Sequence, residues 1–205
     1  MKRFSHGWML IFWVIYGAVF YALEWLVPPR EYVAVWCPLD DRIPFCEWFM
    51  IPYLFWFVYM VWAHGYTFFA DPAAFRRLMK CIMLTFGTAC VIFVVFPTCQ
   101  ELRPGVYPRD NALSRLAAWF YTTDTSTNVF PSLHVCGSIA AGAALADTKR
   151  FGTRGWKWVN FAIVTLISVS TVFVKQHSVL DVIGGIALSA PALWLTYPAK
   201  IWTKV

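Results

Sequence analysis

Two segments decide the fold of this chain, Phe130-Pro-Ser-Leu-His134 and Lys175-Gln-His-Ser-Val-Leu-Asp181. Each lies at one end of a long apolar stretch, where an ionisable side chain is costly unless it has a partner or a function. In the second segment His177 and Asp181 are four residues apart, so on a helix the carboxylate lies one turn from the imidazole on the same face. A carboxylate in that position orients a histidine and makes it a better nucleophile.

The composition of the chain indicates a membrane protein. Of its 205 residues, 60% are hydrophobic and 14% are charged, and the mean hydropathy is +0.57. A soluble domain averages about 45–50% apolar and about 25% charged residues, so a soluble fold is the poorer explanation. Six apolar stretches are long enough, or nearly long enough, to cross a bilayer. They are Trp8–Val27, Phe45–Ala63, Leu78–Phe96, Ser132–Ala146, Trp156–Val174 and Val179–Tyr197.

These stretches predict an all-α, polytopic bundle of six transmembrane helices that occupies residues 1–205 as a single membrane-embedded domain. The fourth stretch is short and rich in small residues such as Gly137 and Ala141, which favours close packing inside the bundle. The first stretch shares one feature with a signal peptide, since Lys2 and Arg3 precede it. It is about 20 residues long and lacks a small-x-small cleavage site, so we interpret it as a retained span.

The distribution of basic residues predicts the orientation of the bundle. With the N-terminus in the cytoplasm, eleven of the 17 Lys and Arg residues fall on the cytoplasmic side and six on the other. Both termini are then cytoplasmic, and the two histidine segments share the extracytoplasmic face of an integral membrane protein, which we expect in a bacterial plasma membrane. The net charge of +6 follows from this topology and does not indicate nucleic-acid binding. The eleven inner residues are Lys2, Arg3, Arg76, Arg77, Lys80, Lys149, Arg150, Arg154, Lys157, Lys200 and Lys204.

The longest predicted connection runs from Pro97 to Phe130, between the third and fourth spans on the extracytoplasmic side. It contains Arg103-Pro104 and then a short amphipathic stretch, Asn111–Tyr121, with Asp110 as the expected N-cap. That stretch is either an interfacial helix beside a lipid entry path or a helical lid packed on the bundle. The sequence leaves both interpretations open.

Two of the six cysteines, Cys37 and Cys46, fall on or near the outer face. A disulfide between them would be compatible with an oxidising compartment. Cys81, Cys90 and Cys136 lie in apolar stretches and are interpreted as small core residues.

Together these motifs resemble the type 2 phosphatidic acid phosphatase superfamily, in its integral-membrane branch. The pattern of that family is a Lys seven residues before Arg-Pro, then Pro-Ser-x-His, then Ser-Arg, five residues, His, three residues and Asp. Here Pro131-Ser-Leu-His134 matches the second motif in full. The third motif matches at Ser170, His177 and Asp181, and the first survives as Arg103-Pro104. The run Phe-Pro-Ser-Leu-His is also similar to the inositol phosphorylceramide synthases of the same superfamily.

Two positions depart from the family pattern. Phe96 stands where the first motif has Lys, and Thr171 stands where the third motif has Arg, both of which would contact phosphate oxygens. Lys175 follows four residues after Thr171, on the same face of a helix and one turn nearer to His177. We therefore expect Lys175 to replace the lost Arg as a point charge, without the bidentate guanidinium fork.

The resemblance implies a phosphohistidine mechanism. His177 would attack phosphorus while Asp181 holds its other ring nitrogen in the correct tautomer. His134 would protonate the leaving lipid oxygen and then activate the incoming water. No metal or other cofactor is expected, because cationic side chains and helix dipoles would stabilise the developing charge.

The substrate phosphate would be bound by a second group of residues. Arg103 and Lys175 would neutralise the phosphoryl group, and the backbone N–H groups of Ser132 and Leu133 would form an anion cradle at a helix N-terminus. The expected partners are a lipid phosphate substrate and the surrounding membrane lipids, with no nucleic acid. The oligomeric state is left open.

Each candidate also has a structural interpretation. His134 taken alone is compatible with a satisfied histidine at a helix end, the His177–Asp181 pair with a local hydrogen bond, and Pro-Ser with an ordinary helix opening. A zinc site made by His134, His177 and Asp181 would lack a Cys or a third His. The occurrence of all these motifs on one face of the membrane favours a shared phosphate site.

Three functions remain open at this point. The first is hydrolysis of a lipid phosphate or diphosphate, with water as the acceptor. The second is a lipid phosphotransferase, in which an alcohol replaces water on the phosphoenzyme. The third is a non-catalytic lipid-binding or transport protein, which the missing Lys and Arg of the family pattern suggest.

Overall fold

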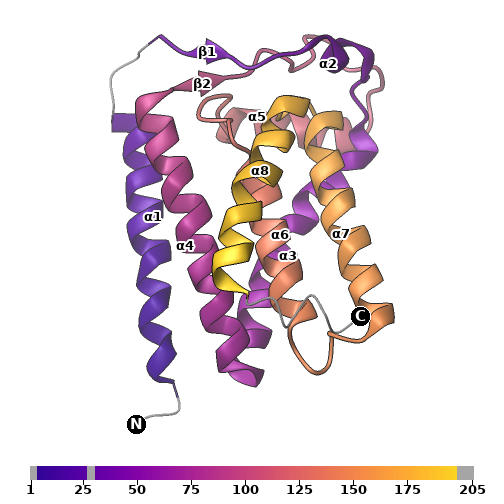
Figure 1. Cartoon of the computed structure of the whole chain (residues 1–205). Coiled ribbons are helices and arrows are strands. Elements are labelled where there is room, and N and C mark those ends of the chain that lie inside the picture. Colours follow the sequence, from indigo (N-terminus) through magenta and orange to yellow (C-terminus); the bar gives the residue numbers. More distant parts are fainter. Residues whose placement is uncertain (1–3, 27–30, 198–205) are drawn as a thin grey trace.

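The computed structural model describes residues 4–26 and 31–197, and six long helices run side by side as a bundle (Figure 1). The first long helix changes its winding along its length. It starts as a 3-10 turn, η1 (Ser5–Leu10), continues as α1 (Ile11–Tyr21) and ends in a π-helical turn, η2 (Ala22–Leu26). The other five are α3 (Met50–Ala70), α4 (Pro72–Val95), α6 (Leu133–Ala146), α7 (Arg154–Phe173) and α8 (Val179–Thr196).

The short elements gather at one end of the bundle, which we call the site end (Figure 1). There β1 (Val33–Ala34) pairs in parallel with β2 (Thr98–Cys99). The same end carries α2 (Pro38–Arg42), η3 (Glu47–Phe49) and α5 (Ala112–Thr123). Because successive long helices alternate in direction, the start of α6 and the connection between α7 and α8 both reach the site end.

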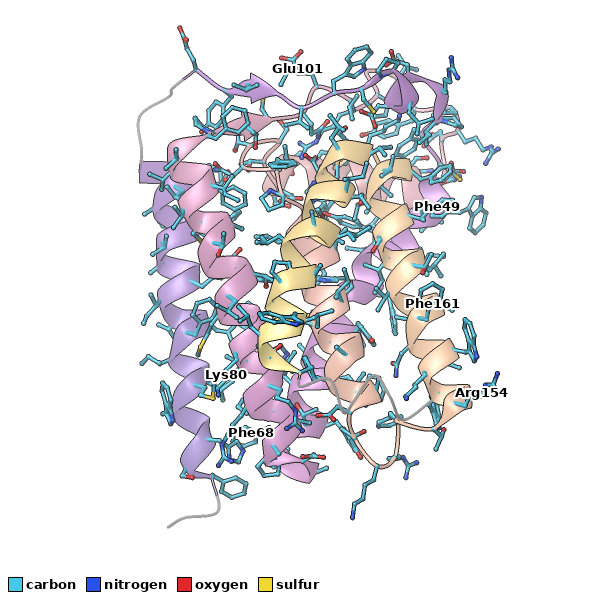
Figure 2. The ribbon with its side chains drawn as sticks, viewed as in Figure 1. Phe49, Phe68, Lys80, Glu101, Arg154 and Phe161 are labelled. Carbon is cyan, nitrogen blue, oxygen red and sulfur yellow. The ribbon has the colours of Figure 1, made fainter. Side chains whose placement is uncertain are left out.

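The end opposite the site end is rich in Lys and Arg, and we call it the basic end. Lys80 and Arg154 lie toward this end in Figure 2, whereas Glu101 lies at the site end. Among the described residues, seven Lys and Arg lie at the basic end and five at the site end, and Lys2, Arg3, Lys200 and Lys204 lie outside the described residues. The orientation in the membrane stays a prediction. The described residues of the basic end are Arg76, Arg77, Lys80, Lys149, Arg150, Arg154 and Lys157.

Within residues 4–26 and 31–197, four helices are long and apolar enough to cross a membrane, namely Ser5–Trp25, Pro72–Val95, Arg154–Phe173 and Val179–Thr196. The other two long helices differ from these. α6 has only 14 residues, and α3 has 21 residues but carries His64, Tyr66 and Thr67 near its end. The all-helical fold is confirmed and its apolar helices fit a membrane protein, whereas the count of six spans stays a prediction.

Helix boundaries follow capping residues rather than the edges of the apolar stretches. The Asp71 carboxylate accepts a hydrogen bond from Ala74 N at 3.0 Å and Pro72 occupies the first turn, so α4 begins well before the predicted Leu78. α3 begins after the predicted Phe45 because Cys46 has an extended backbone, with φ of −138° and ψ of 109°. The predicted end of the first span, at Val27, lies outside the described residues.

α6 lies at the centre of the bundle and packs against α3, α4, α7 and α8. Its small side chains permit this close approach, as the sequence predicted: Ala140, Ala141 and Ala144 are fully buried. A Cβ at Gly142 would lie 2.9 Å from Val164 Cγ2 of α7. The helix that carries His134 is thus held by neighbours on all sides, which fixes the position of its first turn.

The amphipathic stretch of the long connection forms α5, which packs on α3 and on Val174. Its N-cap is Asn111, whose Oδ1 accepts from Leu113 N and Ser114 N. The expected N-cap, Asp110, is therefore wrong, and its carboxylate instead pairs with Arg115 at 3.0 Å. α5 covers the bundle as a helical lid would, while the Trp119 side chain on its outer side is exposed.

All six cysteines are free thiols in the structure. Cys37 and Cys46, for which the sequence left a disulfide open, are not bonded to each other. Cys81 and Cys136 are buried, in agreement with their interpretation as core residues.

Candidate active site

His177 and Asp181 meet at the N-terminus of α8. Ser178 is the N-cap, and its backbone N–H donates to Asp181 Oδ2 at 2.9 Å. The same carboxylate oxygen lies 3.2 Å from His177 Nδ1. The predicted pairing is therefore present, but the helix begins at Val179, so His177 lies just before it rather than within it. Asp181 holds Nδ1 and leaves Nε2 of His177 as the ring nitrogen that can react.

His134 lies in the first turn of α6 and faces the other histidine. Its ring is 4.5 Å from both the Tyr53 ring and the Trp56 ring, and 5.7 Å from the His177 ring, measured between centroids. His134 Nε2 is buried and has no hydrogen-bond partner among the described residues. A buried ring nitrogen without a partner is costly, so this atom is available for a substrate or water oxygen.

Both histidines line one cavity of about 310 Å³. Its wall is polar near the histidines, where the loop after α5 and Gln176 contribute. Its remaining wall is aromatic, and three of the rings come from the first long helix. This division suits a ligand with a polar head and an apolar tail. The polar residues are Asp124, Thr125, Thr127, Asn128, Gln176, His134 and His177, and the aromatic ones are Trp13, Tyr16, Phe20, Tyr53, Trp56, Phe57 and Phe86.

Arg103 lies behind this cavity and does not line it. Its guanidinium donates to Gln176 Oε1 at 2.7 and 3.1 Å. It also donates to the carbonyl oxygens of Tyr121 at 3.2 Å, Asp124 at 2.7 Å and Thr125 at 2.9 Å. Burial lowers the pKa of Arg103, against the opposing effect of the Asp124 carboxylate. Because protein oxygens accept from its donors, Arg103 fixes three residues that line the cavity, Gln176, Asp124 and Thr125, without lining the cavity itself.

Lys175 is not where the helical pattern predicted it. α7 ends at Phe173 and Lys175 has a φ of 55°, so it does not share a helical face with Thr171. Its ammonium donates to the carbonyl oxygen of Asp40 at 2.7 Å, and burial lowers its pKa. The helical face that Lys175 was expected to share with Thr171 is therefore wrong, because α7 ends before Lys175. The binding of a phosphate by Lys175 stays a prediction.

The backbone N–H of Ser132 also has a partner. It donates to the carbonyl oxygen of Asp181 at 3.0 Å, so it joins the two histidine segments and is not open to a phosphate. Ser132 Oγ is buried without a hydrogen-bond partner among the described residues. Leu133 begins α6, and its side chain lines the cavity. Of the two backbone N–H groups expected to form an anion cradle, that of Ser132 is taken, which leaves that of Leu133 in the first turn of α6.

Several residues of the site had no clear signal in the sequence. Gln176 Nε2 donates to Asp124 Oδ2 at 2.6 Å, and the Tyr53 hydroxyl donates to the same oxygen at 3.3 Å. Burial raises the pKa of Asp124, although Arg103 and His177 act in the opposite direction. The one available signal was the position of Gln176, immediately before His177.

Glu24 ties the first long helix to the site. Its carboxylate, in the π-helical turn, accepts from Thr127 Oγ1 at 2.7 Å and also from Thr125 Oγ1 and Asn128 Nδ2. These three donors belong to the loop that leads into Phe130-Pro-Ser-Leu-His134. The contact therefore fixes the aromatic residues of the first long helix relative to the two histidines.

Asp40 anchors the other side of the His177 segment. Its carboxylate accepts from Ser178 Oγ at 2.6 Å, Val179 N at 2.8 Å and Cys37 N at 2.8 Å. Burial acts to raise the pKa of Asp40, but these hydrogen bonds outweigh it and hold that pKa below its usual range. Asp40 is thus a structural anion that positions the start of α8.

We expect Asp40→Asn to lower the free energy of unfolding at neutral pH by about 2–3 kcal/mol, because the variant loses charge-assisted hydrogen bonds. The depressed pKa means that the contribution of Asp40 is complete above its unfolded value of about 3.9 and is lost as the pH falls through the lower folded value. The unfolding midpoints of the wild type and of Asp40→Asn in detergent should therefore differ most at neutral pH and converge on acidification below about pH 4. A difference that grows on acidification would contradict this role.

The comparison with known families agrees with this geometry. Residues 32–195 match the model of the PAP2 superfamily, which is more than half of the chain. The chain therefore belongs to the PAP2 superfamily, the type 2 phosphatidic acid phosphatases that its motifs resemble. Membership supports phosphatase-type activity in a broad sense. Neither a curated protein nor a solved structure matches the chain.

Proposed function

We propose that the protein hydrolyses a lipid phosphate or diphosphate through a phosphohistidine intermediate and without a metal ion. One observation carries the proposal: two histidines face one cavity, with His177 Nδ1 held by Asp181 and His134 Nε2 lacking any partner in the described chain. This is the arrangement of a nucleophile with its orienting group opposite a proton donor.

The proposed reaction has two steps. His177 Nε2 attacks phosphorus, the bond from phosphorus to the lipid oxygen breaks, and His134 gives its proton to that oxygen. Water then attacks the phosphohistidine, His134 accepts a proton from the water, and the phosphorus–nitrogen bond breaks. Asp181 stabilises the charge that develops on His177 in the first step. The N-terminus of α6, whose first residues Leu133 and His134 line the cavity, favours the negative charge of the phosphoryl group.

A second candidate, a lipid phosphotransferase, is favoured by the charge of the cavity. Among the described residues no Lys or Arg lines it, whereas the Asp124 carboxylate does. A phosphomonoester dianion would be repelled by Asp124, and a phosphodiester carries only one negative charge. Transfer of a phosphorylated headgroup from a diester to an alcohol, as the likeness to inositol phosphorylceramide synthases suggests, would fit this charge. Arg103, which contacts Gln176 and does not line the cavity, offsets the negative charge of Asp124 only in part.

The two candidates differ in what they release. The experiment incubates the full-length, detergent-purified protein, without added metal, with phosphatidic acid, with a polyprenyl diphosphate, and with phosphatidylinositol plus a long-chain alcohol. Release of inorganic phosphate from either of the first two supports hydrolysis. Transfer of phosphoinositol without release of phosphate supports the phosphotransferase. No turnover of any of them would favour the non-catalytic lipid-binding alternative.

We also propose that the site end faces the extracytoplasmic side of the membrane. The support is the gathering of Lys and Arg at the basic end, since such residues are retained on the cytoplasmic side. An impermeant thiol reagent applied to intact cells should label a cysteine introduced at exposed Glu101 and spare one introduced at exposed Lys149. The reverse pattern would contradict the orientation.

A further inference from the structure

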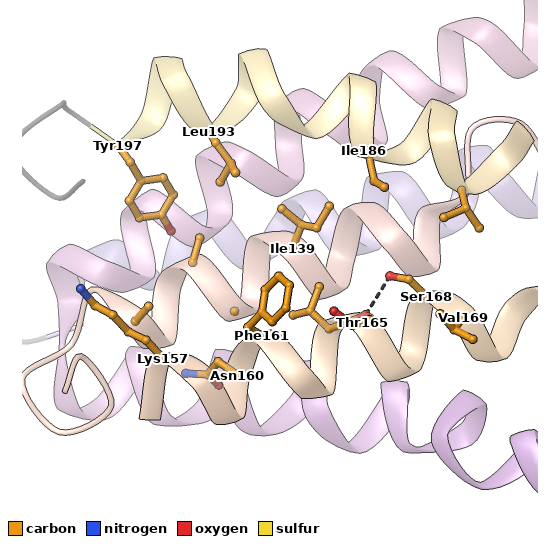
Figure 3. A pocket seen from close by; sticks show the side chains of 15 residues that line it. Ile139, Lys157, Asn160, Phe161, Thr165, Ser168, Val169, Ile186, Leu193 and Tyr197 are labelled. Carbon is orange, nitrogen blue, oxygen red and sulfur yellow. Dashed lines mark hydrogen bonds between the residues drawn. The ribbon is translucent and has the colours of Figure 1, made fainter. Parts of the chain in front are cut away.

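A second, larger cavity opens between α6, α7 and α8, away from the histidines. Figure 3 shows it as a long groove whose walls are mostly apolar, with Ile139 of α6, Phe161 of α7 and Ile186 of α8 among them. Its volume is about 670 Å³, and it shares no lining residue with the histidine cavity. In a membrane-embedded bundle such a groove is open to the tails of the surrounding lipids.

The groove is not apolar throughout. Asn160 and Tyr197 line it at the end where α7 begins and α8 ends (Figure 3). Both side chains are at least nine-tenths buried, with exposed fractions of 4% and 2%. Asn160 Oδ1 accepts from the Tyr59 hydroxyl at 3.3 Å, but Asn160 Nδ2 and the Tyr197 hydroxyl have no hydrogen-bond partner among the described residues. In the described part of the chain these two buried donors have no acceptor, and a ligand oxygen in the groove can supply one.

The same end of the groove is cationic. Lys157 lines it together with Asn160 and Tyr197, and Lys149, Arg150 and Arg154 lie in the adjoining loop and helix turn. The nearby Asp147 carboxylate is paired with Arg77, whose Nε lies 2.5 Å away. The groove therefore offers an apolar channel, two hydrogen-bond donors and positive charge, in that order along its length.

We propose that this groove is a binding site for one anionic phospholipid. An acyl chain lies along the apolar walls, and ester or phosphate oxygens accept from Asn160 Nδ2 and from the Tyr197 hydroxyl. The negative headgroup lies against Lys157 and the neighbouring cations. A helix from a second copy of the chain would fill the apolar part but would supply neither the acceptors nor the negative charge. The site is independent of the histidine chemistry, because the two cavities have separate walls.

Binding is tested with the purified full-length protein in detergent, titrated with dioleoyl phosphatidylglycerol or dioleoyl phosphatidylcholine. The shift of the thermal unfolding midpoint and the mass of the intact complex are the two readouts. We expect one tightly held lipid per chain and a stronger effect of phosphatidylglycerol. Lys157→Gln should weaken phosphatidylglycerol binding about fivefold and leave phosphatidylcholine unchanged, since one surface cation near a lipid headgroup has roughly that effect.

Three further variants sharpen the test. Ala143→Phe places a ring in the groove and should abolish tight binding of both lipids, while Tyr197→Phe removes one donor and should weaken both. Lys80→Gln is the matched control, because exposed Lys80 lies at the basic end on α4 and does not line the groove. If Lys157→Gln and Lys80→Gln affect phosphatidylglycerol equally, or if Ala143→Phe leaves binding intact, the proposal is wrong. A dimer that persists in every lipid would assign the groove to a second copy instead.

Discussion

Replacement of His177 by alanine is expected to reduce turnover of the lipid substrate by about 10⁴-fold or more, the usual scale for loss of a nucleophile that acts with a base. The reason is that His177 alone combines an oriented Nδ1, held by Asp181, with a ring that faces both His134 and the cavity. The readouts are the initial rate with the best substrate of the panel and the acid-labile phosphate that remains on the protein after rapid denaturation. Both should disappear in the variant.

Two controls separate loss of chemistry from loss of fold. His6 Nε2 contacts the carbonyl oxygen of Phe68 far from the cavity, so His6→Gln should keep the wild-type rate. Asp181→Asn should lower the rate strongly and yet allow a folded protein, because it impairs the orientation of His177 without removing the nucleophile. Turnover that survives in a correctly folded His177→Ala variant would show that another residue attacks phosphorus.

The second large effect concerns the contact between α6 and α8. A Cβ on Gly185 would lie 2.9 Å from the carbonyl oxygen of Ser132 and 2.8 Å from Val135 Cβ. The first neighbour is backbone and the second is attached directly to it, so neither can move aside cheaply. Gly185→Ala should therefore destabilise the fold by about 1–3 kcal/mol, the usual effect of overpacking. It should also reduce the rate, because it separates the helices that carry His134 and Asp181.

Gly87→Ala is the matched control for this prediction. Gly87 lies inside α4, and a Cβ there would meet nothing within 4 Å. Alanine in a helix interior is favoured over glycine by about 0.5–1 kcal/mol, so this variant should be as stable as the wild type or more stable. The unfolding midpoint in detergent distinguishes the two outcomes. Equal effects of the two substitutions would mean that the contact of Gly185 with Ser132 does not limit stability.

The class of the fold and the pair of histidines could be predicted from local patterns. Hydropathy over about 20 residues identifies apolar helices without any knowledge of their packing. The spacing of His177 and Asp181 requires only that the two residues lie near one helix terminus, and Pro-Ser before His134 marks a helix opening. These three features depend only on residues that are close in the sequence. The structure contains all of them: the apolar helices, the His177–Asp181 contact and the start of a helix next to His134.

The places of the residues expected to bind phosphate could not be predicted in the same way, because they depend on loops. The expected place of Lys175 assumed that α7 continues through it, whereas the helix ends at Phe173. The carbonyl oxygens that accept hydrogen bonds from Arg103 belong to Tyr121, Asp124 and Thr125, and their positions are set by where α5 ends. No spacing rule relates Arg103 to Gln176, which lies 73 residues away in the chain. Such contacts are tertiary, and only the folded chain reveals them.

The first long helix contributes to the histidine cavity from outside the part of the chain that matches the family model. The matched region of the family begins at residue 32, yet Trp13, Tyr16 and Phe20 form part of the wall around the histidines. Glu24 ties the end of this helix to a single loop through three side-chain donors, and Trp13 Nε1 also donates to His64 Nε2 of α3 at 3.3 Å. Under the proposed function, substitutions at these aromatic residues change the space for the tail of the substrate and leave the residues of the helices that carry the histidine segments unsubstituted. Under the proposed function, a library restricted to these three positions would show whether the lipid preference can change while His134 and His177 are retained.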